Sequence, residues 1–190
     1  MTAEPTPKAD STPSGSSYCD KSPLVAVVMG SISDWEAMEP CCTTLAELGV
    51  PCAVRVLSAH RTPEALDAFL SQTQQAGAQV VIAAAGGAAH LAGVCAAKTT
   101  LPVLGVPMKT SLAGGLDSLL STVQMPAGVP VATFATGRAG AVNAAIFAAM
   151  ILGQTHALIA EAVASRRQQA AAKVLDIGDP RDATATSPTP

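Results

Sequence analysis

The chain has 190 residues, enough for one hydrophobic core, and we expect a single domain over residues 23–175. Charged residues make up only 13% of it and the net charge is −3, so the basic surface that nucleic-acid binding needs is missing. No stretch of 18 unbroken apolar residues occurs, which argues against a membrane span. We therefore expect a small molecule as the partner, with no nucleic acid and no membrane.

The two ends of the chain differ from its middle. Residues 1–22 and 176–190 are rich in Pro, Ser, Thr, Asp and Ala, with too little apolar surface to offset the entropy of ordering, so we expect disordered tails. The first residues are also too polar for an export signal. An odd number of cysteines without a C-x-x-C pair indicates reduced thiols and a cytoplasmic protein; they are Cys19, Cys41, Cys42, Cys52 and Cys95.

Short apolar runs alternate with longer helical segments along the domain. Apolar runs of this length, rich in Val, Ile and Leu, are typical of buried strands. Strand–helix alternation predicts a parallel sheet with helices on both faces, and hence an α/β, flavodoxin-like three-layer sandwich with a five-stranded parallel sheet. The expected strands are Leu24–Met29, Cys52–Leu57, Val80–Ala84, Val103–Val106 and Val129–Thr133.

Helix boundaries are marked between these strands. Ser33 and Glu36 have capping-box spacing at the start of a helix over Trp35–Leu48, which Gly49 closes. Thr62-Pro63 begins the next helix, and Gly77 ends it. Further helices are expected over residues 139–152 and 155–175.

The loop after the first strand carries Ser31, Ser33 and Asp34 at the start of a helix. Backbone N–H groups and the helix dipole favour an anion there, and a carboxylate can accept hydrogen bonds from sugar hydroxyls. This pattern fits a phosphate-and-ribose site. When the loop is taken alone, simple helix capping is the favoured explanation, because Ser and Asp are the ordinary cap residues.

The loop after the second strand, Ser58 to Pro63, contains His60 and Arg61. Arginine suits bidentate phosphate binding, and histidine can transfer protons near neutral pH. A solvated turn histidine is the alternative. Because the carboxyl ends of neighbouring parallel strands meet at one edge of the sheet, we expect this loop to lie beside Ser31 and Asp34.

The loop after the third strand runs over residues 83–94 and contains Gly86, Gly87 and His90. Two glycines remove side chains and leave backbone amides that can approach a flat ligand. His90 is a second candidate for catalysis, and a core histidine in an apolar run is the alternative.

These loops, read with residues 101–107, 115–133 and 139–152, closely resemble the N5-carboxyaminoimidazole ribonucleotide mutase family over residues 24–153. The resemblance implies a flavodoxin-like homo-octamer without metal or organic cofactor. It also implies an isomerase of purine biosynthesis that converts N5-carboxyaminoimidazole ribonucleotide into its 4-carboxy isomer. The chain departs from the family pattern at Ala92, Val94 and Thr136, where the family usually has Pro, Met and Ile, and the lost proline is expected to loosen the loop beside His90.

The resemblance also assigns roles to residues. It implies that His60 and His90 are catalytic and that no residue binds a metal. The implied substrate-binding residues are Ser31, Ser33, Asp34, Ser58, Arg61, Gly86, Gly87, Ala88, Ala89 and Leu91.

Three alternatives stay open. An aminoimidazole ribonucleotide carboxylase would use CO₂ directly, and the related branch has Lys-Gly where this chain has Arg61-Thr62. A noncatalytic nucleotide-binding module would need the first loop but not His60. A structural assembly protein would explain the alanine-rich segments but not three polar loops at one edge.

Between Val80 and Gln154 the only charged residues are Lys98, Lys109, Asp117 and Arg138. A domain of this size exposes much of its surface, and large apolar patches usually mark interaction sites. We therefore expect a homo-oligomer, with the helix over residues 155–175 crossing a neighbouring subunit.

Overall fold

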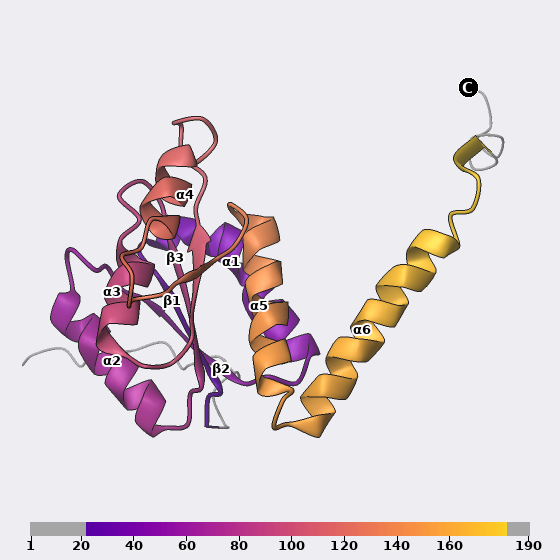
Figure 1. Cartoon of the computed structure of the whole chain (residues 1–190), viewed down its shortest axis with the longest axis horizontal. Helices are drawn as coiled ribbons and strands as arrows, with labels where there is room; N and C mark the ends of the chain where they lie inside the picture. The colour runs from indigo at the N-terminus through magenta and orange to yellow at the C-terminus, as the bar shows by residue number, and fades with distance from the viewer. Residues whose placement is uncertain (1–21, 182–190) are drawn as a thin grey trace, which may run out of the picture.

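Five parallel strands form one sheet in a computed structural model that describes residues 22–181 (Figure 1). Their order is β2-β1-β3-β4-β5, the order of flavodoxin-like sheets, so the predicted fold class is confirmed. Most of the two predicted tails lies outside the described residues. The strands are β1 (Val25–Met29), β2 (Cys52–Val56), β3 (Val80–Ala85), β4 (Val103–Pro107) and β5 (Ala132–Thr133).

Helices cover both faces of the sheet (Figure 1). Helices α1 (Trp35–Glu47) and α5 (Arg138–Leu152) pack on the face that receives Val25 and Val27, and α2 (Pro63–Gln75) and α3 (Leu91–Lys98) pack on the opposite face. Successive strand residues point to opposite faces, so a strand covered on both must be apolar throughout. All five residues of β1 are fully buried, as the continuous apolar run predicts.

The predicted strands agree with the observed ones to within one residue at each end, except for the last. We expected Val129–Thr133, and only Ala132–Thr133 pairs with β4. Pro130 has no N–H to donate to the sheet, which explains why this edge strand is short.

One predicted helix cap is wrong. We expected a capping box on Ser33 and Glu36, but the box is formed by Ser31 and Asp34. A short 3-10 helix, η1 (Ile32–Asp34), precedes α1 and moves the cap two residues towards the N-terminus. The other helix boundaries that we marked, Thr62-Pro63, Gly49 and Gly77, lie where they were predicted.

Two helices of eight residues were not predicted, α3 and α4 (Leu116–Val123). Helix α3 begins at Leu91, inside the loop that we expected to continue to residue 94. Ala92 is therefore the second residue of a packed helix and is only 2% exposed, so this departure from the family pattern does not lie in a loop.

The last helix, α6 (Ala157–Leu175), extends away from the body of the molecule (Figure 1). Ile159 is its only buried residue. Leu158 and Leu175 are about 80% exposed, although leucines are usually buried. The helix therefore has an apolar surface that the single chain does not cover.

Candidate active site

A polar cleft of about 480 Å³ lies at the carboxyl ends of β1, β2, β3 and β4. From β1 the chain moves to β2 on one side and then returns to β3 on the other, so the strand order reverses beside β1. Open α/β sheets bind ligands at this point, because the loops diverge there and leave a crevice. The three predicted loops meet in this cleft.

The first loop is held in place by its own hydrogen bonds. The Ser31 N–H donates to Asp34 Oδ2 at 3.1 Å, and the Ser31 hydroxyl accepts from the Ser33 N–H at 3.2 Å. The Ser33 hydroxyl also donates to Ser31 Oγ at 2.8 Å. Both hydroxyls and the Asp34 carboxyl line the cleft. Capping and ligand binding are compatible here, because the Ser31 O–H is still free to donate and the Asp34 carboxyl is still free to accept.

Burial raises the pKa of the Asp34 carboxyl, and the hydrogen bond from the Ser31 N–H partly opposes this rise. A raised pKa means that the folded chain binds this proton more tightly than the unfolded chain. The contribution of Asp34 to stability is therefore greatest below its ordinary pKa of 3.8 and is lost as the pH rises through the raised value. At neutral pH the ionised Asp34 carboxylate therefore lowers the stability of the folded chain, as expected of a group whose role is to bind a ligand.

The second loop places Arg61 beside the first loop in the lining of the cleft. Its guanidinium Nη2 donates to the Gly30 carbonyl at 3.0 Å, which ties the two loops together. Thr62 stabilises the turn, because its hydroxyl accepts from the Ser58 N–H at 2.9 Å and donates to the Ser58 carbonyl at 3.1 Å. The other N–H groups of the Arg61 fork remain available to an anion.

His60 and His90 are in direct contact. His60 Nε2 lies 2.9 Å from His90 Nδ1, and the rings meet edge to face with centroids 5.0 Å apart. One nitrogen must donate and the other must accept, so the contact holds a single proton between the rings. Two cationic imidazoles would break it. His90 is exposed, which excludes the core histidine that we considered as its alternative.

The third loop differs from the prediction in one respect. We expected both glycines to present free backbone amides, but the Gly87 N–H donates to the buried Ser118 hydroxyl at 2.9 Å. Among the described residues, neither Gly86 nor Ala88 has a hydrogen-bond acceptor for its N–H. Gly86 also needs to be small, because a Cβ there would lie 3.2 Å from Cβ of Met108.

Most of the predicted site residues line the cleft. His90 does not line it but contacts His60, Gly87 is held by Ser118, and Ala89 is only 1% exposed. The predicted residues that do line the cleft are Ser31, Ser33, Asp34, Ser58, His60, Arg61, Gly86, Ala88 and Leu91.

Sequence reasoning missed the contribution of the fourth strand. Met108, Lys109 and Thr110 follow β4 and line the same cleft. Thr110 donates to Asp117 Oδ1 at 2.6 Å, and this bond lowers the pKa of that carboxyl. The rule that placed the first three loops at one edge applies equally to the end of β4 and could have found these residues.

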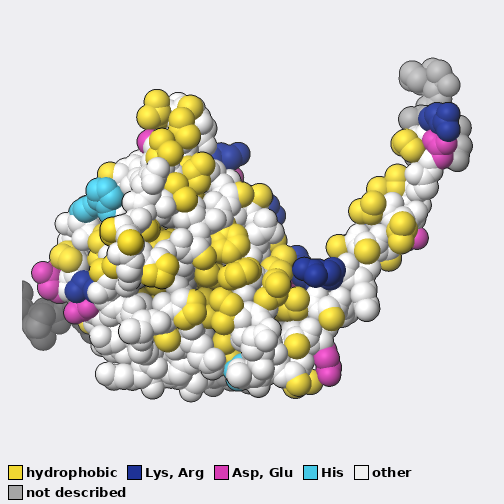
Figure 2. Space-filling view, viewed as in Figure 1, with side chains coloured by type: hydrophobic (Ala, Val, Ile, Leu, Met, Phe, Trp, Pro, Cys, Tyr) yellow, Lys and Arg dark blue, Asp and Glu magenta, His cyan; other side chains and the backbone are white. Residues whose placement is uncertain are grey.

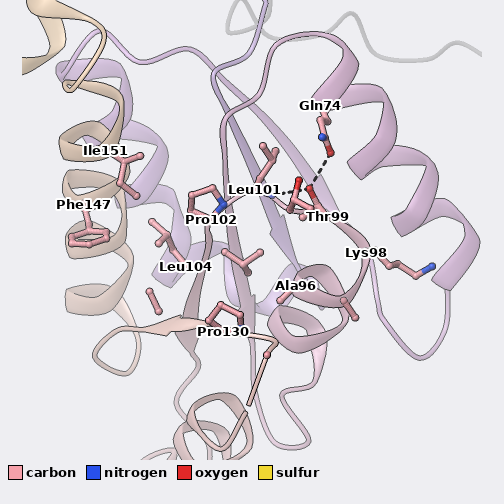
Figure 3. A pocket seen from close by; sticks show the side chains of 15 residues that line it. Gln74, Ala96, Lys98, Thr99, Leu101, Pro102, Leu104, Pro130, Phe147 and Ile151 are labelled. Carbon is pink, nitrogen blue, oxygen red and sulfur yellow. Dashed lines mark hydrogen bonds between the residues drawn. The ribbon is translucent and has the colours of Figure 1, made fainter. Parts of the chain in front are cut away.

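A larger hollow of about 930 Å³ lies elsewhere, between α3, β4 and α5 (Figure 3). Its lining is mainly apolar and includes Leu101, Phe147 and Ile151. Lys98, at its rim, is paired with Asp67 at 3.0 Å. The hollow has no histidine or carboxyl in its lining, so we assign the chemistry to the smaller cleft.

Residues 22–181 give little support for a metal site or a membrane span. No group of three or more His, Cys, Asp or Glu side chains there could hold a metal ion, and none of the helices is long and apolar enough to cross a membrane. The four cysteines in this range are free and lie outside the cleft. Cys19 lies outside the described residues.

The fold and the cleft define a class: a flavodoxin-like α/β protein with a polar small-molecule cleft at the switch point of its sheet. The chain belongs to the AIR carboxylase family, whose model matches residues 24–173. This match and the relatives described next confirm the resemblance found in the sequence.

Several relatives are similar over most of the chain. The N5-carboxyaminoimidazole ribonucleotide mutase of Pseudomonas aeruginosa is 56% identical over 162 residues, which cover 85% of this chain and 99% of the relative. The mutase of Bacillus subtilis is 51% identical, covering 83% and 97%. The crystal structure of Treponema denticola PurE superposes with a TM-score of 0.75 at 28% identity, covering 82% and 96%.

Proposed function

We propose that the protein converts N5-carboxyaminoimidazole ribonucleotide into 4-carboxy-5-aminoimidazole ribonucleotide in purine biosynthesis. The observation that carries this proposal is the position of His60, which lines the same cleft as Arg61 and the serine loop. A proton carrier thus lies within reach of any ribonucleotide that these residues bind. The close similarity to proteins named as mutases supports the same reaction.

In this proposal the first two loops bind the ribonucleotide. Arg61 and the hydroxyls of Ser31, Ser33 and Ser58 hold the phosphate by charge-assisted hydrogen bonds, and the Asp34 carboxylate accepts bonds from the ribose hydroxyls. The hydrogen bond from Arg61 to the Gly30 carbonyl orients the guanidinium before the ligand arrives. Such preorganisation lowers the entropic cost of binding.

The reaction needs one bond broken and one formed. Cationic His60 protonates N5, the N–C bond of the carbamate breaks with its electron pair on nitrogen, and aminoimidazole ribonucleotide and CO₂ result. C4 then attacks CO₂, and neutral His60 removes the C4 proton and recovers its charge. The proton is returned, so the step is an isomerisation without a cofactor; proton transfer of this kind contributes roughly 10²–10⁴-fold.

The third loop keeps CO₂ close during this exchange. We assign this role to the backbone of residues 86–89 and to Leu91, with the N–H groups of Gly86 and Ala88 directed at CO₂ and the new carboxylate. The Gly87 amide orients the loop through Ser118 instead. Holding CO₂ beside C4 replaces a collision in solution by a reaction within the site.

We assign His90 to positioning the His60 ring. When His60 is cationic, its Nε2–H can donate to neutral His90, and this charge-assisted bond fixes the orientation of the ring. When His60 is neutral, the same contact selects one tautomer and directs the remaining nitrogen.

An assay of the purified protein with two substrate sets tests the reaction. We expect conversion of N5-carboxyaminoimidazole ribonucleotide and none of aminoimidazole ribonucleotide with bicarbonate at comparable concentration. Conversion of the second set alone would assign the protein to the carboxylases, as the family description allows. Binding without conversion of either would leave a noncatalytic module.

Replacing Arg61 with alanine should weaken substrate binding more than it slows the chemistry. The guanidinium supplies a charge-assisted contact, whose loss costs about 1.5–3 kcal/mol and raises KM about tenfold or more. Steady-state kinetics measure this, with Arg55→Ala as a control, since Arg55 is exposed on β2 and donates to the Val54 carbonyl. An unchanged KM would move the phosphate site away from Arg61.

We further propose a cytoplasmic homo-octamer. Apolar side chains gather between α3 and α5 and over α4 in Figure 2, and the exposed ones include Leu112, Leu116, Leu120 and Phe147. The apolar hollow of Figure 3 lies in the same region. Patches of this kind are rare on monomers, and a second copy of the chain supplies a matching apolar surface on α6.

Light scattering of the purified protein checks this assembly. We expect a single species of eight subunits at micromolar concentration, because closed symmetric assemblies cover such patches completely. A chain truncated after Gly153 serves as the comparison and should form smaller species. An active monomer would refute the burial argument, and a tetramer would refute the octamer.

A further inference from the structure

A second recess of about 400 Å³ opens beside the cleft. It shares Ser33, Asp34, Met108 and Lys109 with the cleft, so the two hollows adjoin each other. Its far wall is formed by Gly137 and Arg138, at the first turn of α5. The recess therefore connects the serine loop with two cationic side chains that no sequence motif singled out.

The recess also contains the Glu36 side chain, but neither of the two cations is paired with a carboxylate in the described part of the chain. Neither Lys109 nor Arg138 makes an ion pair or a side-chain hydrogen bond with another of residues 22–181. A Cβ added at Gly137 would lie 3.4 Å from Cγ and 3.5 Å from Cε of Lys109, so the lysine stem runs along the start of α5. Arg138 is the first residue of that helix, where the N-terminal N–H groups add positive potential.

The charges of the cleft make a further cation useful. Arg61 and Asp34 carry opposite charges and cancel, and Glu36 adds a negative charge at the recess. A ribonucleotide brings a phosphate dianion and, in the carbamate substrate, a carboxylate. A phosphate has three terminal oxygens, and Arg61 already directs Nη2 at the Gly30 carbonyl. Lys109 lines the cleft and the recess, so it can supply the missing positive charge.

We propose that Lys109 binds the 5′-phosphate of the ribonucleotide from the side opposite Arg61, and that Arg138 reinforces it across the recess. This inference rests on the proposed function and adds two residues to its phosphate site. We assign these cations to the phosphate because the recess adjoins the cleft at Ser33 and Asp34, the residues to which the proposed function assigns the phosphate and the ribose. The residues beside the reacting carbon, His60, Gly86 and Ala88, line the cleft but not the recess.

Calorimetry with aminoimidazole ribonucleotide and with its 4-carboxy derivative tests the proposal on the full-length protein. We expect Lys109→Gln to weaken binding of both ligands about tenfold, and Arg138→Gln about threefold, because Arg138 acts at longer range through solvent. Lys109→Arg should keep most of the affinity. Arg55→Gln, which removes an exposed cation of β2 that lies outside the cleft and the recess, is the matched control and should change nothing.

The two ligands distinguish the phosphate from the carboxylate. Equal weakening of both supports the phosphate assignment, since both carry it. Weakening confined to the carboxylated ligand would overturn that assignment. Unchanged affinity in Lys109→Gln, with a normal thermal melt, would overturn the inference and leave the proposed function intact. Failure of the unmodified protein to bind either ligand would refute both.

Discussion

Replacing His60 with asparagine is expected to reduce turnover at least about 100-fold while ribonucleotide binding survives. The imidazole carries the proton in both halves of the proposed reaction, and general acid–base catalysis contributes about 10²–10⁴-fold. Asparagine is similar in size and polarity but cannot take up a proton near neutral pH. Arg61, Ser33 and Asp34 stay in place, so affinity measured by calorimetry should change little.

His156→Asn provides the matched control for this variant. His156 precedes α6, where its ring contacts the Gln79 side chain at 3.3 Å, and it lies outside the cleft. Its replacement should leave turnover unchanged. If His60→Asn kept more than about a tenth of wild-type activity, the loss would be too small for a general acid–base residue, and the chemistry would have to be assigned elsewhere.

Gly140→Ala is expected to produce the largest loss of stability among single-methyl additions. Gly140 lies in the first turn of α5, where the chain passes close to Ala135. A Cβ there would overlap the Ala135 carbonyl oxygen and lie 2.7 Å from its carbonyl carbon. Backbone must move to relieve this, so we expect a loss of about 3 kcal/mol, near the upper end of the usual cost of overpacking. Thermal unfolding measures it.

Asn143→Ala is the control for that substitution. Asn143 is exposed on the same helix, and alanine has the higher helix propensity, so stability should stay the same or rise slightly. A melting temperature for Gly140→Ala equal to that of the control would mean that the close approach to Ala135 is absent in solution.

The parts of the fold that follow from local pattern were predictable. Val25 to Met29 form a short continuous apolar run that is rich in valine and is followed by Gly30, which is typical of a strand covered on both faces. The shortening of β5 is a different case, because it depends on which neighbour the segment pairs with as well as on Pro130. The capping box moved from Ser33 to Ser31 because a 3-10 turn, which has no distinct sequence pattern, precedes α1.

The sequence predicted the three loops of the candidate site, because each loop directly follows a strand and the carboxyl ends of parallel strands meet at one edge of the sheet. Contacts between distant segments were not: Ser118 accepts the Gly87 N–H across 31 positions, and the His60–His90 contact spans 30. These distances depend on how loops close over the finished sheet. The strand-end rule could have placed Lys109 in the cleft, but Arg138 could not be placed beside it, since only the packing of α5 against the end of β4 brings the two together.

The central claim is that CO₂ passes within the site from N5 to C4, and isotope transfer tests it most directly. The purified protein is given N5-carboxyaminoimidazole ribonucleotide labelled with ¹³C in its carboxylate, together with excess unlabelled bicarbonate, and the product is analysed by mass spectrometry during the first turnovers. The proposed reaction predicts that most of the label remains in the 4-carboxylate, because the trapped CO₂ recombines faster than it escapes. A product labelled no more than the bicarbonate pool would contradict it.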